Sequence, residues 1–178
     1  RITHEAYRTH YKLTEEPRVS VIIPNKDHVK DLECCISSMV EKTAYKNIEY
    51  LIVENNSEEA ETFLCYERIK EKYKEKEIKI LHWESGFNYS LINNFAVAQA
   101  TGDYLLFLNN DTEMINKDCI EEMVTFCMRE GTGAVGARLF YPDGDIQHAG
   151  VIVGLGGIAG HAFLGLNHDD SGYFSRAI

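Results

Sequence analysis

The sequence contains no internal repeat, no low-complexity linker and no run of about 18 apolar residues that would span a membrane. It also has no CxxC pair, and its five cysteines are odd in number, with Cys34 and Cys35 adjacent. This usage is typical of reduced, mostly buried thiols in a cytosolic protein. No signal-peptide pattern opens the sequence. We therefore expect a folded segment without a membrane span, located in the cytoplasm or, in a full-length protein, at the inner face of the membrane.

Positive charge is also scarce, because 18 Lys and Arg residues stand against 28 Asp and Glu residues, for a net charge of −10. The longest Lys-rich run, ERIKEKYKEKEIK, intersperses four acids among its six Lys and Arg residues and is typical of a solvated helix face. Such a chain repels a phosphate backbone, so nucleic acid is disfavoured as a partner. At 178 residues and 44% hydrophobic content, the chain is long and apolar enough for one domain with a sizeable core.

Strand-like and helix-like patterns alternate along the chain. Apolar or β-branched runs predict strands at residues 19–23, 48–53, 78–82, 103–108 and 133–141. Helical spacing predicts helices in the segment after Pro24 through Thr43, at about 58–76, over 90–102 with Gly102 as the stop, and at about 117–130. DYLLFL is continuously apolar, as a central parallel strand is, and the turn sequence PDGD precedes a returning strand in AGVIVG.

This alternation predicts a Rossmann-like α/β fold with a mostly parallel central sheet flanked by helices. We expect residues 1–16 to lead into one domain of this fold over residues 17–178.

Polar residues gather where three predicted strands end: PNKD after the first, ENNS after the second and NNDTE after the fourth. Any one of these segments alone is typical of a turn or helix cap, but parallel strands would bring all three to one crevice. If the chain stays extended, Asn109 and Asp111 point to the same side. Their oxygens suit Mg²⁺ or Mn²⁺ completed by substrate phosphate, and an acidic protein needs such a cation to hold an anionic nucleotide.

The segments PNKD, IVENNS, NNFAVAQATGDYLLFLNND and DGDIQHAGVIVG occur in an order that resembles the family 2 glycosyltransferases with the GT-A fold. The closest resemblance is to the rhamnosyltransferase-like branch of bacterial surface-polysaccharide synthesis, and it covers residues 9–178. It implies a nucleotide-diphospho-sugar donor, Mg²⁺ or Mn²⁺, a glycan or lipid-linked glycan acceptor, and inversion at the anomeric carbon. It also implies a C-terminally truncated fold and further domains of a longer protein.

The resemblance also implies roles for particular residues. Asp111 matches the last Asp of the family's Asp-x-Asp motif, whereas Asn109 replaces the first and leaves one fewer charge for the metal. Glu54 stands where the family has an Asp that hydrogen-bonds the base, and Asn94 follows a position where Asn93 replaces an Arg. The implied metal ligands are Asp111 and Asn109, and the implied nucleotide-sugar-binding residues are Pro24, Asn25, Asp27, Glu54, Asn55, Asn94, Asn109 and Asn110.

The catalytic base is not identified in this sequence. In the family it is an acidic residue well after the metal motif, so we expect it beyond Ile178 and expect residues 1–178 to transfer little or no sugar alone. Two other functions stay open: a noncatalytic nucleotide-binding or interaction module, and, with less support, a nucleotidyltransferase. The latter expects a Gly-rich loop after the first strand, and PNKDHVK has no glycine.

Some further patterns have a functional and a simpler structural interpretation. Phe87 and Tyr89 would serve either to stack on a sugar or base or to lead into a helix. GLGGIA fits a dinucleotide-binding pattern but has no clear helix after it. His148, His161 and His168 have spacings that match no compact zinc pair, so a loop or substrate-lining role is favoured over zinc.

Overall fold

The computed structural model describes residues 9–170. Leu13–Glu121 form one compact unit, here called the sheet unit. The described residues before and after it form a second, here called the terminal unit. The assignment of residues 17–178 to a single domain stays a prediction. No helix within residues 9–170 is long and apolar enough to cross a membrane.

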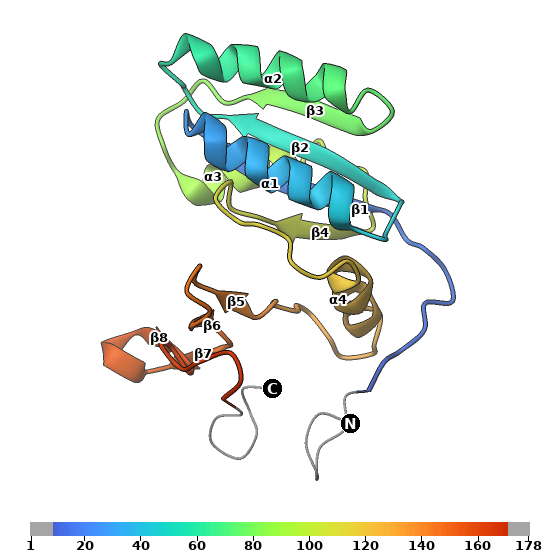
Figure 1. Ribbon diagram of the computed structural model, residues 1–178, viewed down its shortest axis with the longest axis vertical. Coiled ribbons are helices and arrows are strands. Elements are labelled where there is room, and N and C mark those ends of the chain that lie inside the picture. The colour runs from blue at the N-terminus through green and yellow to red at the C-terminus, as the bar shows by residue number, and fades with distance from the viewer. Residues whose placement is uncertain (1–8, 171–178) are drawn as a thin grey trace. The chain divides into compact units, whose positions relative to one another are not determined.

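The sheet unit is built on a four-stranded sheet in which every pairing is parallel. Figure 1 shows the strands side by side in the order β3-β2-β1-β4. Their bounds are β1 Val19–Asn25, β2 Ile48–Glu54, β3 Glu77–His82 and β4 Tyr104–Phe107. β1 and β2 are buried along nearly their whole length, as their β-branched sequences predict. The predicted parallel α/β fold is therefore confirmed.

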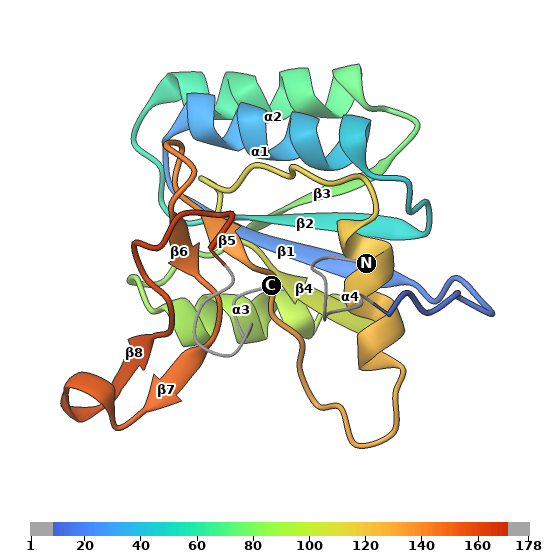
Figure 2. The same ribbon diagram turned by 60° about the horizontal axis from the view of Figure 1, so that its bottom comes forward.

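Helices α1 (Val29–Lys42) and α2 (Ala60–Lys72) cover one face of the sheet, and α3 (Tyr89–Val97) covers the other (Figure 2). In α1, apolar side chains at helical spacing are buried against the sheet. On the opposite face, Ile92 and Ala96 of α3 pack into a core cluster. The cluster also contains Ile22, Leu51 and Val53. The strands are thereby fixed from both sides, which holds their ends in place.

Three local predictions are wrong. β4 is an edge strand among the described residues rather than a central one, and Leu105 and Phe107 are partly exposed. The strand predicted over 133–141 is reduced to β5 (Leu139–Phe140), because the glycines and polar residues before it form no ladder. Helix α3 ends at Val97, well before Gly102.

Gly102 has a steric role instead of ending a helix. A Cβ at this position would lie 2.6 Å from both the backbone nitrogen and the hydroxyl of Ser20 and 2.9 Å from the carbonyl oxygen of Arg18. The Gly102 nitrogen donates a hydrogen bond to Ser20 Oγ at 2.9 Å. Glycine is needed here because the chain entering β4 passes directly against the start of β1.

The terminal unit contains two antiparallel strand pairs. β5 pairs with β6 (Ile146–His148), and the predicted PDGD turn joins them, with Gly144 at a positive φ of 94°. β7 (Val151–Val153) pairs with β8 (Ala159–His161), and GLGGIA forms the connection between them and the start of β8. The segment is therefore a hairpin end rather than a phosphate loop leading into a helix. Helix α4 (Cys119–Cys127) crosses the boundary between the two units.

A buried carboxylate ties the strands together at their amino ends. Glu49 on β2 is fully buried and accepts hydrogen bonds from Ser20 Oγ at 2.6 Å and Thr101 Oγ1 at 2.8 Å. Lys79 Nζ of β3 lies 3.0 Å from it. Burial alone would raise the pKa of Glu49, but these hydrogen bonds together lower it to about 2. Glu49 therefore stabilises the fold as a carboxylate.

We predict that Glu49→Gln lowers the free energy of unfolding at pH 7 on the order of 2 kcal/mol. Because the pKa of Glu49 is lower in the folded than in the unfolded state, this contribution is complete above about pH 4.5 and is lost as the pH falls towards about 2. Urea unfolding of both chains across this range checks the expectation. A difference that does not shrink towards acid pH would contradict it.

We also predict that Gly102→Ala destabilises the chain by about 1–3 kcal/mol, because the new methyl group meets backbone atoms that cannot rotate away. Gly86→Ala is the matched control, since its Cβ would have no neighbour within 4 Å. Thermal unfolding of the two variants measures the contrast, and equal effects would show that the close approach at Gly102 is not limiting.

Candidate functional site

The carboxyl ends of β1, β2 and β4 meet at one edge of the sheet. Asn25 and Glu54 form the last register pair of β1 and β2, and the Asn55 nitrogen continues the ladder to the Asn25 oxygen at 2.8 Å. After β4, Asn110 Nδ2 donates to Asn25 Oδ1 at 2.7 Å. The predicted convergence of the three polar segments is therefore confirmed.

The polar side chains at this edge form a continuous hydrogen-bond chain. Glu54, only 4% exposed, accepts hydrogen bonds from the Ser57 backbone nitrogen, the Ser57 hydroxyl and the Tyr66 hydroxyl of α2. Tyr66 in turn accepts a hydrogen bond from Asn25 Nδ2 at 2.9 Å. Burial and the neighbouring Glu54 raise the pKa of Tyr66, so the phenol stays protonated and donates to the carboxylate. The chain thus runs from Asn110 through Asn25 and Tyr66 to Glu54.

The loops after β1 and β2 adopt an unusual backbone conformation. Asp27, His28 and Asn56 have positive φ values of 54°, 51° and 54°, in the left-handed region that non-glycine residues rarely occupy. This path brings Asp27 to the start of α2, where its Oδ1 accepts hydrogen bonds from the backbone nitrogens of Glu58 and Glu59, both at 3.0 Å. These bonds lower the pKa of Asp27. Asp27 therefore helps to cap α2 from a different element.

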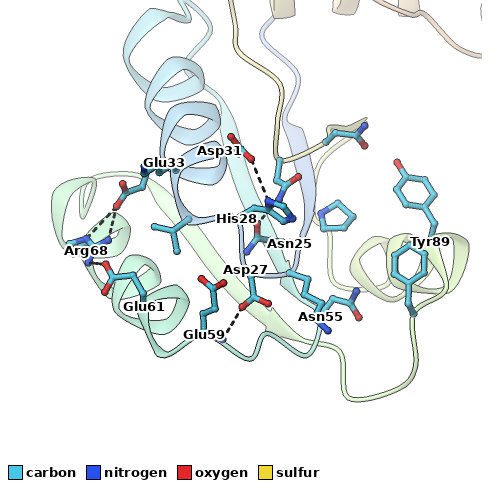
Figure 3. A pocket seen from close by; sticks show the side chains of 17 residues that line it. Asn25, Asp27, His28, Asp31, Glu33, Asn55, Glu59, Glu61, Arg68 and Tyr89 are labelled. Atoms are coloured by element: carbon cyan, nitrogen blue, oxygen red, sulfur yellow. Dashed lines mark hydrogen bonds and ion pairs between the residues drawn. The ribbon is translucent and has the colours of Figure 1, made fainter.

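A cleft opens along this edge (Figure 3). Arg68 lies at one end between Glu33 and Glu61, with N–O distances of 2.9 Å and 2.8 Å, and Tyr89 lies at the other end. Phe87, 75% exposed, joins Tyr89 as an aromatic surface in the cleft. The lining residues are Pro24, Asn25, Lys26, Asp27, His28, Val29, Lys30, Asp31, Glu33, Asn55, Glu59, Glu61, Arg68, Phe87, Tyr89, Asn109 and Asn110.

The lining carries five carboxylates against three Lys and Arg side chains. Arg68 is already paired with two of those carboxylates, and Lys26 is paired with Glu58 at 3.0 Å. A diphosphate entering this cleft would meet net negative charge. A cation would offset this repulsion, and Asp111 is the residue predicted to hold that cation.

Asp111 is exposed beside the cleft and follows two of its lining residues, Asn109 and Asn110. The segment after β4 passes against α1, where the Cys35 thiol lies 3.7 Å from the Asn109 carbonyl oxygen. Burial, with smaller contributions from Cys34 and Asp111, raises the pKa of Cys35 to about 12. β4 ends at Phe107, and Asn110 and Asp111 lie in a turn in which the Thr112 nitrogen bonds the Asn109 oxygen at 3.3 Å. The premise that an extended chain points Asn109 and Asp111 to one side is therefore wrong.

The donor set at Asp111 nevertheless suits a hard cation, because a carboxylate and neighbouring amide oxygens are what Mg²⁺ and Mn²⁺ prefer. Within residues 9–170, no three His, Cys, Asp or Glu side chains form a metal-holding cluster. The ligand roles of Asp111 and Asn109 stay predictions.

Two other predicted ligands do not line the cleft. Asn94 is exposed on α3, whereas its neighbour Asn93 is buried and donates to the Tyr89 carbonyl oxygen at 2.8 Å. Glu54 lies beneath the cleft, where three donors already occupy it. Direct contact of Asn94 or Glu54 with a nucleotide stays a prediction.

Sequence reasoning missed Tyr66 and Arg68, because both lie in the charge-rich helix interpreted as a solvated face. A signal was present: Thr62, Cys65, Tyr66 and Ile69 recur at helical spacing, and all four are buried. In the terminal unit, the structure brings His148 and His161 together, with 2.9 Å between their Nδ1 atoms. Their separation of 13 residues gave no hint of this contact.

The family of the chain follows from its sequence as well as its fold. Residues 20–152 match the profile described as "Glycosyl transferase family 2". The chain belongs to this family. The match includes β1, β2 and β4, the three strands whose ends form the cleft.

Two curated relatives resemble nearly the whole chain. An uncharacterized protein, y4gI, of Sinorhizobium fredii is 42% identical over 96% of this chain and 19% of its own length. The O-antigen biosynthesis protein RfbC of Myxococcus xanthus is 42% identical over 88% of this chain and 12% of its own length. The chain therefore spans less than a fifth of the length of either relative.

Solved glycosyltransferase structures share the fold. The mannosyltransferase PcManGT of Pyrobaculum calidifontis, in complex with GDP-Man and Mn²⁺, superposes with a TM-score of 0.66 at 20% identity. The match covers 73% of this chain and 37% of PcManGT. Residues 1–349 of TarS of S. aureus, in complex with UDP-GlcNAc, give a TM-score of 0.51 at 22% identity, over 69% of this chain and 38% of that TarS fragment. The expected GT-A fold is confirmed.

We predict that Glu54→Gln lowers the free energy of unfolding by about 1–3 kcal/mol, because one of the three donors around it would face an amide N–H group. Glu58→Gln serves as the control, since Glu58 is solvent-exposed in its pair with Lys26 and its loss should change stability little. Chemical denaturation of both variants gives the comparison. Equal stability of the wild type and Glu54→Gln would refute the structural importance of the buried carboxylate.

Proposed function

We propose that this chain is the donor-binding part of an inverting glycosyltransferase that transfers sugar from a nucleotide-diphospho-sugar to a surface polysaccharide or related glycan. The observation that carries the proposal is the joining of three strand ends into one cleft beside Asp111 in a family 2 chain. The similarity to RfbC, an O-antigen biosynthesis protein, supports a glycan acceptor. The similarity to PcManGT with GDP-Man and to TarS with UDP-GlcNAc supports a nucleotide-diphospho-sugar donor.

In this proposal the nucleoside lies against the aromatic surface of Phe87 and Tyr89, where a base or sugar ring can stack. The polar groups of Asn25 and Asn55 would then fix its orientation through hydrogen bonds. Pro24 and Asp27 shape the same wall, with Asp27 held by its bonds to the start of α2. The diphosphate would extend towards Asn109 and Asn110.

Asp111, with Asn109, would hold Mg²⁺ or Mn²⁺ at the diphosphate. When bound, the cation would neutralise the charge that develops on the departing nucleoside diphosphate. The residues of this chain would bind and orient the donor, and an acidic residue beyond Ile178 would deprotonate the acceptor hydroxyl. We place this chemistry in the cytoplasm, or at the inner membrane face when the acceptor is lipid-linked.

We predict that the chain binds UDP, dTDP or GDP only with Mn²⁺ or Mg²⁺ present, and that Asp111→Asn weakens this binding at least ~10-fold. Isothermal titration calorimetry with each nucleotide, with and without metal, measures it. Glu113→Gln is the matched control, because it removes a nearby exposed carboxylate that is paired with Lys42.

Equal losses in the two variants would indicate a general charge effect and contradict the metal-ligand role of Asp111. No binding of any nucleotide under either condition would overturn the proposal and favour a noncatalytic interaction module.

A further inference from the structure

Tyr66 is buried in α2 immediately behind the cleft, yet it is not one of the lining residues. Its hydroxyl lies between two polar groups from different strands, donating to Glu54 of β2 and accepting from Asn25 of β1. Only 3% of the residue is exposed, so water cannot readily replace these partners. The only polar group of this side chain is therefore committed to the ends of two strands.

The directions of these hydrogen bonds are fixed by chemistry. An ionised carboxylate only accepts hydrogen bonds, so the Tyr66 hydroxyl must donate its single proton to Glu54. Its oxygen must then accept from Asn25, which requires the Asn25 amide nitrogen to face Tyr66. The Asn25 oxygen consequently faces Asn110 and receives its amide N–H group at 2.7 Å. The orientation of both amides thus follows from the charge of Glu54.

This ordering determines what Asn110 can offer to a ligand. Its amide nitrogen is directed at Asn25, which leaves Oδ1 as its acceptor, in the residue immediately before Asp111. An amide oxygen is a suitable partner for a hard cation or a ribose hydroxyl, whereas an amide nitrogen would repel a cation. Reversal of the Asn110 amide would therefore weaken the site without moving the backbone.

We propose that Tyr66 is a positioning residue for the donor site, and that its hydroxyl sets the amide orientation of Asn25 and Asn110 for binding a metal-complexed nucleoside diphosphate. The inference rests on the proposed function. Tyr66 does not touch the ligand in this account. It acts by connecting the buried charge of Glu54 to the two amides.

The test compares Tyr66→Phe with Tyr73→Phe, which supplies a closely matched control from the same sequence region. Tyr73 directly follows α2, is 6% exposed and donates its hydroxyl to a glutamate, Glu41 of α1, but it lies outside the cleft lining. Each variant loses one tyrosine hydroxyl bound to a carboxylate. A purely structural role of Tyr66 would therefore affect both variants alike.

Titration with Mn²⁺ and the nucleoside diphosphate that binds the wild type best should show about 10-fold weaker binding by Tyr66→Phe and unchanged binding by Tyr73→Phe. Without ligand, NMR should show faster hydrogen exchange of the Asn25 and Asn110 side-chain amides in Tyr66→Phe only. Tyr73→Phe should leave the exchange rates of these two side-chain amides unchanged.

The outcomes distinguish the positioning role of Tyr66 from the proposed function. If the wild type binds nucleotide and Tyr66→Phe binds equally well, the positioning role is overturned while the proposed function stands. Unchanged amide exchange in Tyr66→Phe overturns the positioning role as well, whatever the nucleotide result. If the wild type binds no nucleotide, the proposed function fails and the role of Tyr66 in donor binding fails with it.

Discussion

The edge of this sheet is organised by a buried negative charge that has to be satisfied. Glu54 ends β2 with only 4% of its surface exposed, and a carboxylate removed from water is costly unless donors surround it. The Ser57 nitrogen and hydroxyl and the Tyr66 hydroxyl supply these donors. Because Tyr66 spends its proton on Glu54, Asn25 and then Asn110 must turn their amides in one direction. A single desolvated charge thereby orders residues from α2 and from the ends of β1 and β4.

Strand β2 carries a second buried acid, Glu49, which binds a different set of residues from Glu54. Glu49 binds Ser20, Thr101 and Lys79 towards the amino ends of the strands. Glu49 and Glu54 are five residues apart, so their side chains point to opposite faces of the sheet. Glu49 holds the segment that leads into β4, on the face of the sheet covered by α3. Glu54 holds the carboxyl ends of the strands, on the face covered by α2. The cleft therefore rests on strands held at both ends, which suits a site that must hold its ligands in a set geometry.

The sequence was sufficient to predict the parallel sheet and its convergent polar edge, because continuous apolar runs and their abrupt polar ends depend on local composition. It was not sufficient for features that depend on distant contacts. Gly102 resembled a helix stop, but its role comes from Ser20, 82 residues away. Tyr66 was hidden in a charged helix, and the turn after Phe107 was not evident from LLFLNND. Six of the residues named by resemblance to a family line the cleft, whereas the hydrogen bonds that orient them could not be predicted.

We propose above all that the strand ends around Asn25 and Asn110, together with Asp111, hold a cation and a nucleoside diphosphate. Paramagnetic broadening by Mn²⁺ of the side-chain amide signals tests it most directly. With nucleotide present, substoichiometric Mn²⁺ should erase the signals of Asn109 and Asn110 first. It should spare that of Asn47, which donates to the Glu16 oxygen before the start of β2. Equal broadening of Asn47 and Asn110, or preferential broadening elsewhere, would contradict the account.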